Sequence, residues 1–307
     1  MTVDDYCDRA RSVHTSIDTG IPELMPERMV TQVGSRRVTI SHLDKPLWPD
    51  FSKAQMLDYY LHVADFLLPH IRRRPASFLR TPDGSTGPRF FTHEAPPGLP
   101  KWIHKVPKAD HTHVAVDDIE TLIAVANYYC VEIHVPQWTA ETGPDLHDQI
   151  VFDLDPGEGA DIGTCCKVAL LVHEMLAEDG FDSFVTTTGG AGLHLYISLD
   201  PPWLIDDAVA YAKSIAQRLS AAHRDLITHV RGAKARAGGK VLVDWAQNHS
   251  RATTSAPYTL RAREAAPAVS TPLEWHEVER ADPDSLDFSP ADVLERITEL
   301  GDLTGMS

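Results

Sequence analysis

IVFDLD, at residues 150–155, is an apolar run interrupted only by two aspartates. So short an apolar run, bounded by turn residues, predicts a buried strand. The chain then turns at PGEG, forms an amphipathic helix and returns through two extended segments around a glycine-rich turn. This order of strand, helix, strand, turn and strand predicts an α/β domain. The segments after the first strand are a helix over 162–177, capped by Asp161 and closed by Gly180, strands over 184–188 and 193–199, and the turn 189–192.

The flanking sequence predicts one compact domain with an additional N-terminal α/β subregion. Ser52 is placed to cap a helix whose apolar residues recur every three or four positions to about His70. Residues 75–107 are rich in proline and glycine, which predicts hairpins and loops. Other predicted elements are strands over 37–41, 113–117, 131–135 and 241–247, and helices over 118–128, 206–222 and 290–300. The predicted regions are an arm (1–35), the main domain (36–275) and an acidic helix and tail (276–307).

Length, composition and the first residues argue against three classes of protein. The 307 residues include only four irregularly spaced cysteines, so a disulfide framework is not expected. No apolar tract approaches the roughly 20 residues of a membrane helix. The first residues are acidic and polar, where a secretion signal has a basic flank and an apolar core. We therefore expect a cytoplasmic protein that does not enter a membrane.

Charge is distributed unevenly along the chain. A net charge of −16 argues against a nucleic-acid partner. However, residues 71–108 hold eight basic and two acidic side chains, and residues 230–263 hold seven basic and one acidic. Residues 270–307 hold ten acidic and two basic side chains. The two basic segments are suited to phosphate groups, although solvated surfaces would have the same composition.

Three aspartates on apolar strands are the candidate metal ligands. Asp153 and Asp155 are two residues apart, so both carboxylates project from one face of a strand, with Cα atoms about 7 Å apart. Asp244 lies within a second apolar strand, VLVDW. Converging carboxylates suit Mg²⁺ or Mn²⁺, and two such ions promote in-line displacement at phosphorus. Acids facing water at a strand end, or a buried Asp244 bonded to an arginine, are the structural alternatives.

The turn TTTGGAGLH has the features of an anion site. Its glycines allow backbone N–H groups to approach a phosphate, Thr188 offers a hydroxyl, and His194 follows on the next strand. An ordinary glycine hairpin beside a core histidine is the alternative. The possible zinc ligands are Cys165, Cys166, His111, His113 and His173. Zinc is not expected, because Cys165 and Cys166 are adjacent on a helix and cannot both face one ion.

Five ordered motifs resemble one known family, the polymerase module of bacterial DNA ligase D and its free-standing relatives in the archaeo-eukaryotic primase superfamily. The resemblance covers about residues 35–275 and implies a catalytic sheet like that of an RNA-recognition motif. The motifs are HLDKPLWPD (42–50), EIHVPQW (132–138), VFDLDPG (151–157), GGAGLHLY (189–196), and GKVLVDWAQN (239–248) followed by TTSAPYTLRAR (253–263).

The resemblance also implies roles for individual residues. It implies that the catalytic metal ligands, for two Mn²⁺ or Mg²⁺ ions, are Asp153, Asp155 and Asp244. It implies that the nucleoside triphosphate is bound by Thr188, His194, His134, Gln247 and Arg261. It implies that DNA is bound by Lys45 and Lys53, at the 5′-phosphate of a downstream strand, and by Phe90 and Phe91, which border bases. An exposed Lys53 in a first helical turn and a small core around the two phenylalanines are the alternatives.

Two departures refine the expectation. The family's glycine turn usually carries a serine and a lysine where this chain has Thr188 and Ala191, so we expect weaker nucleotide binding unless Arg261 or an arginine of 231–236 compensates. The sequence contains no Lys-x-Asp-Gly nucleotidyltransferase motif, so ligation is expected from another polypeptide.

The resemblance thus predicts a template-directed primase-polymerase of bacterial DNA repair, associated with the nucleoid. It would extend 3′-OH ends with ribo- or deoxyribonucleotides at gaps or double-strand breaks. A separate ligase and an end-binding protein are the expected partners. Two alternatives use the same residues. A DNA-end or gap binding module with weakened catalysis would recruit a ligase, and a metal-dependent nuclease would need no triphosphate site.

Overall fold

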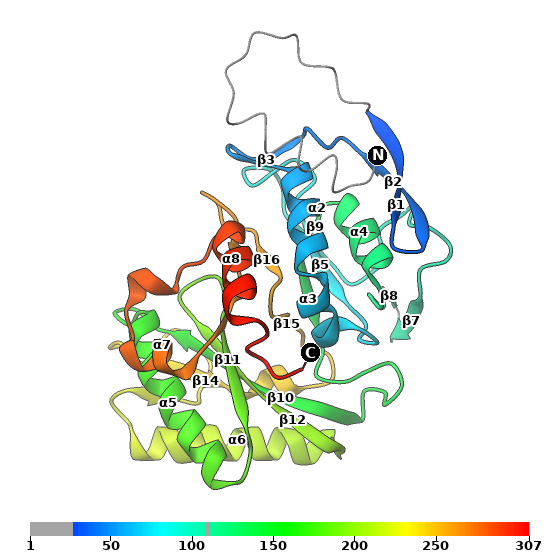
Figure 1. Cartoon of the computed structure of the whole chain (residues 1–307). Helices are drawn as coiled ribbons and strands as arrows, with labels where there is room; N and C mark the ends of the chain where they lie inside the picture. Colours follow the sequence, from blue (N-terminus) through cyan, green and yellow to red (C-terminus); the bar gives the residue numbers. More distant parts are fainter. Residues whose placement is uncertain (1–26, 109–110, 307) are drawn as a thin grey trace. The chain divides into compact units, whose positions relative to one another are not determined.

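The computed structural model describes residues 27–108 and 111–306, and they form two compact units (Figure 1). The first unit contains the described residues up to Ile133 together with Ala262–Pro267. The second contains His134–Arg261 and the described residues from Ala268 onward. The mixed α/β fold class predicted from the sequence is confirmed. The predicted region boundaries at residues 35 and 275 stay a prediction.

A six-stranded sheet forms the centre of the second unit. Its three central strand pairs are antiparallel, and one edge strand runs parallel to its neighbour. The strand order across the sheet is β13 (Ile227–Thr228), β14 (Val241–Asp244), β10 (Leu146–Pro156), β12 (Leu193–Leu204), β11 (Ser183–Thr187) and β18 (Pro272–Leu273).

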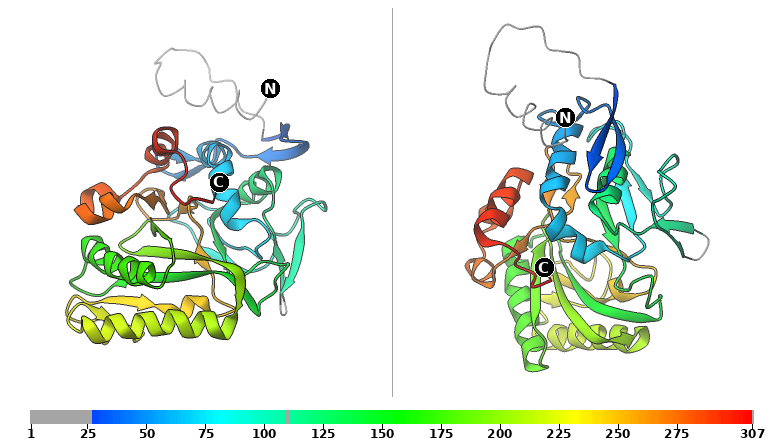
Figure 2. Two further views of the ribbon diagram at one scale, coloured as in Figure 1. Left: turned by 60° about the horizontal axis from the view of Figure 1, so that its bottom comes forward. Right: turned by 45° about the vertical axis from the view of Figure 1, so that its right-hand side comes forward.

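Helices α5 (Ile162–Glu178) and α6 (Ile205–Ala222) pack on the same face of this sheet (Figure 2). Alternate strand residues such as Phe152, Leu154 and Leu195 are fully buried. Because strand side chains alternate, the residues between them project from the other face, where the candidate site lies. The alternation of apolar and polar residues along these strands therefore determines which face of the sheet holds the candidate site.

Local signals place the helix ends. The Asp161 carboxylate accepts a hydrogen bond from the Thr164 amide at 2.8 Å, as an N-terminal cap does. Ser52 and Ser289 cap α2 (Lys53–His62) and α8 (Pro290–Leu300) in the same manner. The helices predicted from these caps begin where the sequence indicates.

The first unit surrounds helices α2, α3 (Ala64–Ile71) and α4 (Ile119–Asn127) with short strands. The Ser35 amide and hydroxyl both donate to the Glu120 carboxylate, at 2.7 and 2.8 Å, which ties the first hairpin to α4. Strand β9 (Cys130–Val135) leads the chain into the second unit. The other strands are β1 (Arg28–Val33), β2 (Arg36–Ser41), β3 (Pro46–Trp48), β4 (Phe51–Ser52), β5 (Ser77–Arg80), β6 (Phe90–Thr92), β7 (Lys105–Lys108) and β8 (His111–Val114).

Several element boundaries differ from the prediction. The helix predicted to reach His70 breaks at Val63 into α2 and α3. The predicted arm contains β1, which pairs with β2, while residues 1–26 lie outside the described residues. The strand predicted over 113–117 is β8, and the strand predicted over 241–247 ends at Asp244. Propensity locates elements better than it locates their ends.

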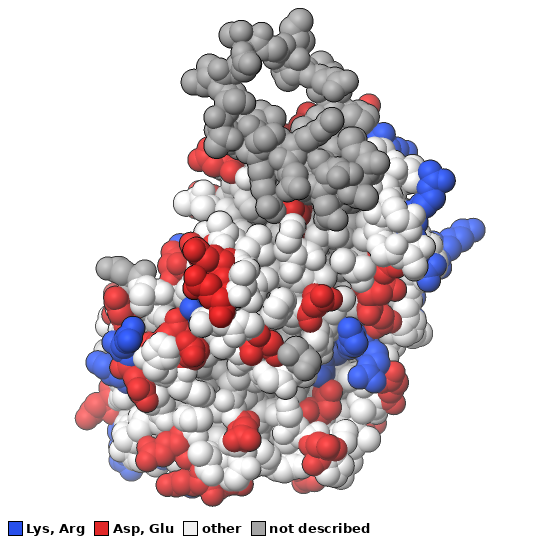
Figure 3. Space-filling view, in the orientation of Figure 1, with Lys and Arg blue, Asp and Glu red and all other residues white. Residues whose placement is uncertain are grey.

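The C-terminal part of the second unit adds short elements. In Figure 3, acidic side chains gather over α8, in agreement with the charge of residues 270–307. None of the described helices combines the length and hydropathy that a bilayer span requires. The elements that complete this unit are η1 (Trp245–Asn248), β15 (Thr254–Ser255), β16 (Leu260–Arg261), β17 (Ala268–Val269), α7 (Trp275–Arg280) and η2 (Pro283–Leu286).

Candidate active site

Sheet register brings the three predicted carboxylates together. Asp153 on β10 lies opposite Asp244 on β14 and, on its other side, opposite His194 on β12. Asp155 follows two residues later on the same face. One carboxylate oxygen from each of Asp153, Asp155 and Asp244 lies within 4.8 Å of the others. A single cation can contact all three aspartates.

Like charges dominate the electrostatics of this cluster. Burial, reinforced by the neighbouring Asp153 carboxylate, raises the pKa of Asp155 to about 6. Two arginines provide the opposing charge. Arg231 contacts Asp244 at 2.8 Å, and Arg236 lies 3.7 Å from Asp155. The alternative predicted from the sequence, an Asp244 bonded to an arginine, is therefore found in the structure. It occurs together with the carboxylate cluster.

His194 is held between the carboxylates and a tyrosine. Its Nε2 lies 3.3 Å from the Asp153 carboxylate, and its Nδ1 lies 3.0 Å from the Tyr196 hydroxyl. That hydroxyl donates to the Ser255 carbonyl at 3.2 Å. Ser255 pairs with His134 between β15 and β9. Ser255 therefore links the two histidines: its carbonyl accepts from Tyr196, which contacts His194, and its backbone pairs with that of His134.

The short helix η1 positions Gln247, another residue of the predicted site, next to Asp153. The Asp244 carboxylate accepts from the Ala246 amide at 3.0 Å, which caps this turn directly after β14. Gln247 then donates from its side-chain nitrogen to Asp153 at 3.2 Å. The Asn248 side chain bonds both the amide and the carbonyl of Val151, so η1 is tied to β10.

The glycine turn and Arg261 fit closely together. Gly189 has a φ of +68°, and a Cβ atom there would lie 2.5 Å from the Arg261 Cγ. Glycine is therefore required at this position, because it tolerates the positive φ and has no Cβ atom to clash with Arg261. Thr188 closes the turn, because its amide and hydroxyl donate to the Gly192 carbonyl at 3.0 and 3.2 Å. Ala191 is exposed.

Lys45 and Lys53 meet in the first unit at the ring of Tyr129. Their ammonium nitrogens lie 5.1 and 4.4 Å from its centroid. Lys53 is fully buried, and it donates to the Ser41 carbonyl at 2.6 Å. Burial, with a smaller contribution from Lys45, lowers the pKa of Lys53 to about 7. The alternative of an exposed helix lysine is wrong, because the side chain crosses to β2 rather than facing water.

Phe90 and Phe91 are on β6 in the first unit. Their side chains are 50% and 49% exposed, so the alternative of a small core around them is wrong. Phe91 contacts His93 edge-on, with ring centroids 5.3 Å apart. Exposed aromatic rings of this kind can stack on bases without sequence preference.

The donor chemistry of the carboxylate cluster fits a hard divalent cation. Three oxygen ligands, one with a raised pKa, are clustered beside Arg231, Arg236 and His194. The described cysteines fit no such site. Cys165 and Cys166 are buried in α5, and Cys165 faces the Leu154 carbonyl at 3.6 Å. The cluster of acids is therefore the candidate metal centre.

Tyr196, Arg231 and Arg236 are the site residues whose contacts sequence reasoning missed. Tyr196 could have been found, because it is two residues after His194 and alternation places both on one face. The arginines of 231–236 were noted as possible triphosphate ligands, and the alternative of an arginine bonded to Asp244 named no residue. Their contacts to Asp244 and Asp155 carry no local sequence signal.

The profile of the LigD primase-polymerase domain matches residues 52–304 of this chain. The chain belongs to the LigD primase-polymerase family. As predicted, it is a primase-polymerase domain, and hence a nucleotidyltransferase. The chain is 39% identical over 281 residues to the multifunctional non-homologous end joining DNA repair protein LigD of Mycobacterium tuberculosis. That match covers 87% of this chain and 36% of the relative.

Other LigD proteins are similar over the same part. The bifunctional non-homologous end joining protein LigD of Bacillus subtilis is 29% identical over 268 residues, covering 86% of this chain and 43% of that protein. The chain thus spans less than half of these LigD relatives. The solved polymerase domain of Mycobacterium tuberculosis ligase D in complex with DNA matches with a TM-score of 0.80 and 37% identity, covering 87% of this chain and 96% of that one.

Proposed function

We propose that this chain extends 3′-OH ends at DNA gaps or breaks by a template-directed, two-metal reaction. The observation that carries the proposal is the cluster of Asp153, Asp155 and Asp244 beside His194 and the glycine turn. Anionic ligands for cations and donors for phosphate groups therefore occupy one face of one sheet. Phosphoryl transfer requires this combination.

The three aspartates would hold Mn²⁺ or Mg²⁺ ions. When bound, these ions would lower the pKa of the attacking 3′-OH and neutralise charge on the leaving pyrophosphate. Binding requires Arg231 and Arg236 to release their carboxylates. Each arginine would then be available to the phosphates of the nucleotide or the template.

The incoming triphosphate would lie between the glycine turn and His194. Thr188 and the turn amides would face this position, and Arg261 lies against Gly189. His194 would donate from Nε2 to a phosphate oxygen, while Gln247 and His134 contribute from η1 and β9. Ala191 offers no cation, so Arg261 would supply most of the opposing charge in the turn.

DNA would be contacted by residues of the first unit. Lys45 and Lys53 would bind the 5′-phosphate of a downstream strand, which requires the buried Lys53 to leave the Ser41 carbonyl. Phe90 and Phe91 would stack on bases. The solved LigD relative was determined in complex with DNA, which supports DNA as the substrate class. We propose that a separate ligase and an end-binding protein act with this chain, because its 307 residues carry no Lys-x-Asp-Gly nucleotidyltransferase motif.

Primer extension tests the proposal. Blunt, gapped and open templates would be supplied with ribo- or deoxyribonucleotides and with Mn²⁺ or Mg²⁺. We expect extension by the native chain and its loss in Asp153→Ala and Asp244→Ala, with unchanged thermal unfolding. Asp206→Ala, an exposed acid at the start of α6, serves as the control. Extension by the Asp244→Ala protein would contradict the two-metal reaction.

A DNA-end binding module is the second candidate function. It is favoured by Ala191 in the turn and by the arginines that already contact the carboxylates. Titration with Mn²⁺ and a nucleoside triphosphate separates the two, since a module would show no metal-dependent nucleotide binding. An Ala191→Lys variant should bind the triphosphate more tightly if the turn is a working phosphate site.

A further inference from the structure

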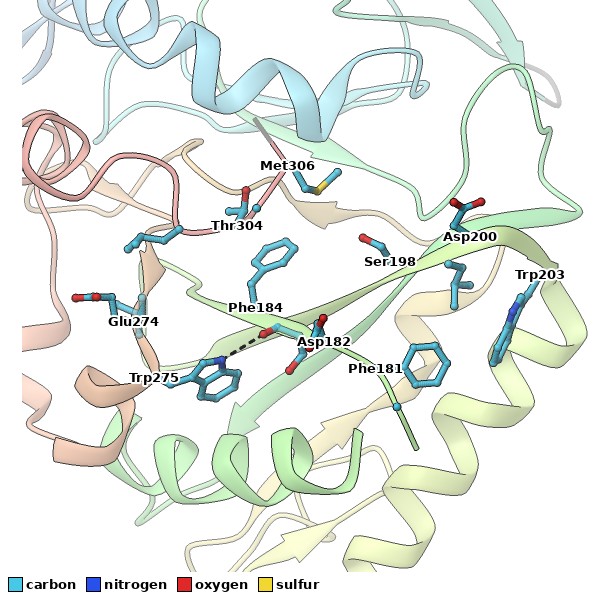
Figure 4. Close-up of a pocket in the computed structure, with 16 residues that line it drawn as sticks. Phe181, Asp182, Phe184, Ser198, Asp200, Trp203, Glu274, Trp275, Thr304 and Met306 are labelled. Atoms are coloured by element: carbon cyan, nitrogen blue, oxygen red, sulfur yellow. Dashed lines mark hydrogen bonds between the residues drawn. The ribbon is translucent and has the colours of Figure 1, made fainter. Parts of the chain in front are cut away.

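A cavity lies on the sheet of the second unit, apart from the carboxylate cluster. Its volume is about 960 Å³. Figure 4 shows the side chains that line it. It lies on the same sheet face as His194 but past Tyr196, where Ser198 and Asp200 continue β12. The start of β11, the start of α7 and residues 303–306 form its other walls. The size is at the upper end of the roughly 300–1,000 Å³ that ligand pockets span.

Aromatic rings that are already fixed line this cavity. Phe184 stacks on Tyr196, with centroids 4.9 Å apart and planes within 14°. Trp275 donates to the Ser183 carbonyl at 3.2 Å and stacks on His173 at 3.8 Å. A ligand would meet walls that need little reordering, which favours binding.

The charge of the lining has one sign. Asp182, Asp200 and Glu274 line the cavity, and no lysine or arginine does among the described residues. Within the part of the chain that the structure describes, Asp182 and Asp200 form no ion pair. In Figure 4 Glu274 and Asp200 lie toward opposite ends, with Asp182 between them. A DNA strand would be repelled here, while cations are attracted.

We propose that this cavity docks a basic segment of a partner protein. Arginine or lysine side chains would pair with Asp182 and Asp200, and their stems would cover Phe184 and the neighbouring rings. Carboxylates at both ends suit a segment with several cations better than one small cation. The proposal goes beyond the polymerase function and does not depend on it.

Fluorescence anisotropy of a labelled octapeptide with alternating arginine and leucine tests this docking on the full chain. We expect saturable binding that added salt weakens, and no binding of the matched peptide with glutamate for arginine. Asp182→Asn combined with Asp200→Asn should weaken binding about tenfold, the equivalent of 1.4 kcal/mol. The matched control is Asp206→Asn with Asp207→Asn, two exposed acids on α6 that do not line the cavity.

Three results would overturn the proposal: no peptide binding, equal weakening by the control pair, or displacement of the peptide by an equal concentration of spermidine. The last would assign the cavity to a small polyamine. Primer extension and triphosphate affinity should stay unchanged in the Asp182→Asn, Asp200→Asn protein. Failure of the docking is thus distinguishable from failure of the polymerase function.

Discussion

Asp153 and Asp244 are direct partners in the antiparallel pairing of β10 and β14. Their carboxylates therefore leave the sheet at the same height and on the same face, although the residues are far apart in the chain. Asp155 joins them two positions along β10. The cost of placing these charges together is offset in the structure by Arg231 and Arg236.

Arg231 competes with a cation for Asp244. Its side chain is 61% exposed, so its ion pair contributes at most about 1 kcal/mol. We expect Arg231→Ala to tighten Mn²⁺ binding by up to roughly fivefold, measured by calorimetry. The exposed Arg251→Ala serves as the control. Weaker Mn²⁺ binding in Arg231→Ala would show that the arginine supports the ion rather than opposing it.

Mn²⁺ binding should depend on pH through Asp155. Its pKa of about 6 means that the carboxyl group holds a proton below pH 6, and a protonated group does not ligate a cation. We expect affinity to fall about tenfold per pH unit below 6 and to level off above 7. A flat profile between pH 5 and 7 would exclude Asp155 as a ligand.

The same pKa affects the stability of the metal-free protein. Because the folded pKa is raised, the stabilising contribution of the protonated group is present at low pH and lost as pH rises through 6. Asp155→Asn should therefore raise the free energy of unfolding at pH 7.5 by roughly 1 kcal/mol, a value reduced by the 43% exposure of the side chain. Urea unfolding with a chelator present measures it.

Tyr196 should act as a positioning residue for His194. Tyr196→Phe keeps the stack on Phe184 but removes the hydroxyl that contacts His194 Nδ1 and the Ser255 carbonyl. Such a loss costs about 1–3 kcal/mol. We expect KM for the triphosphate to rise about tenfold, with a smaller change in kcat. Tyr211→Phe, whose hydroxyl bonds Asp179 instead, should leave KM unchanged.

The glycine turn offers a matched pair of variants. Gly189→Ala places a side chain at positive φ and against Arg261, which should cost about 1–2 kcal/mol of stability and weaken triphosphate binding. Gly190→Ala meets only the Thr188 hydroxyl oxygen, at 3.6 Å, so it should be tolerated. Equal effects of the two substitutions on triphosphate affinity would show that Arg261 does not depend on this close approach.

We predict that the buried ammonium group of Lys53 lowers the free energy of unfolding, although its proposed role is to bind DNA. Its folded pKa of about 7 is depressed, so stability is lost as pH falls from about 10 toward 7. Lys53→Met should raise the free energy of unfolding at pH 7 by roughly 1 kcal/mol. It should also abolish any preference for a gap with a downstream 5′-phosphate. The exposed Lys101→Met should change neither quantity.

Local patterns in the sequence were enough to predict the order β10, α5, β11, turn and β12, the cap at Asp161 and the shared face of Asp153 and Asp155. These features depend on residues close together in the chain, whose period and capping chemistry can be read directly. The family motifs extended this prediction to the residues of the candidate site.

Tertiary structure decided which distant residues meet. It placed Asp244 opposite Asp153, Arg231 on Asp244 and the Tyr196 hydroxyl on the Ser255 carbonyl. It also buried Lys53 and formed the acidic aromatic cavity. Strand register and long-range packing determine these contacts. Neither can be read from the pattern of neighbouring residues in the sequence, because the residues in contact are far apart in the chain.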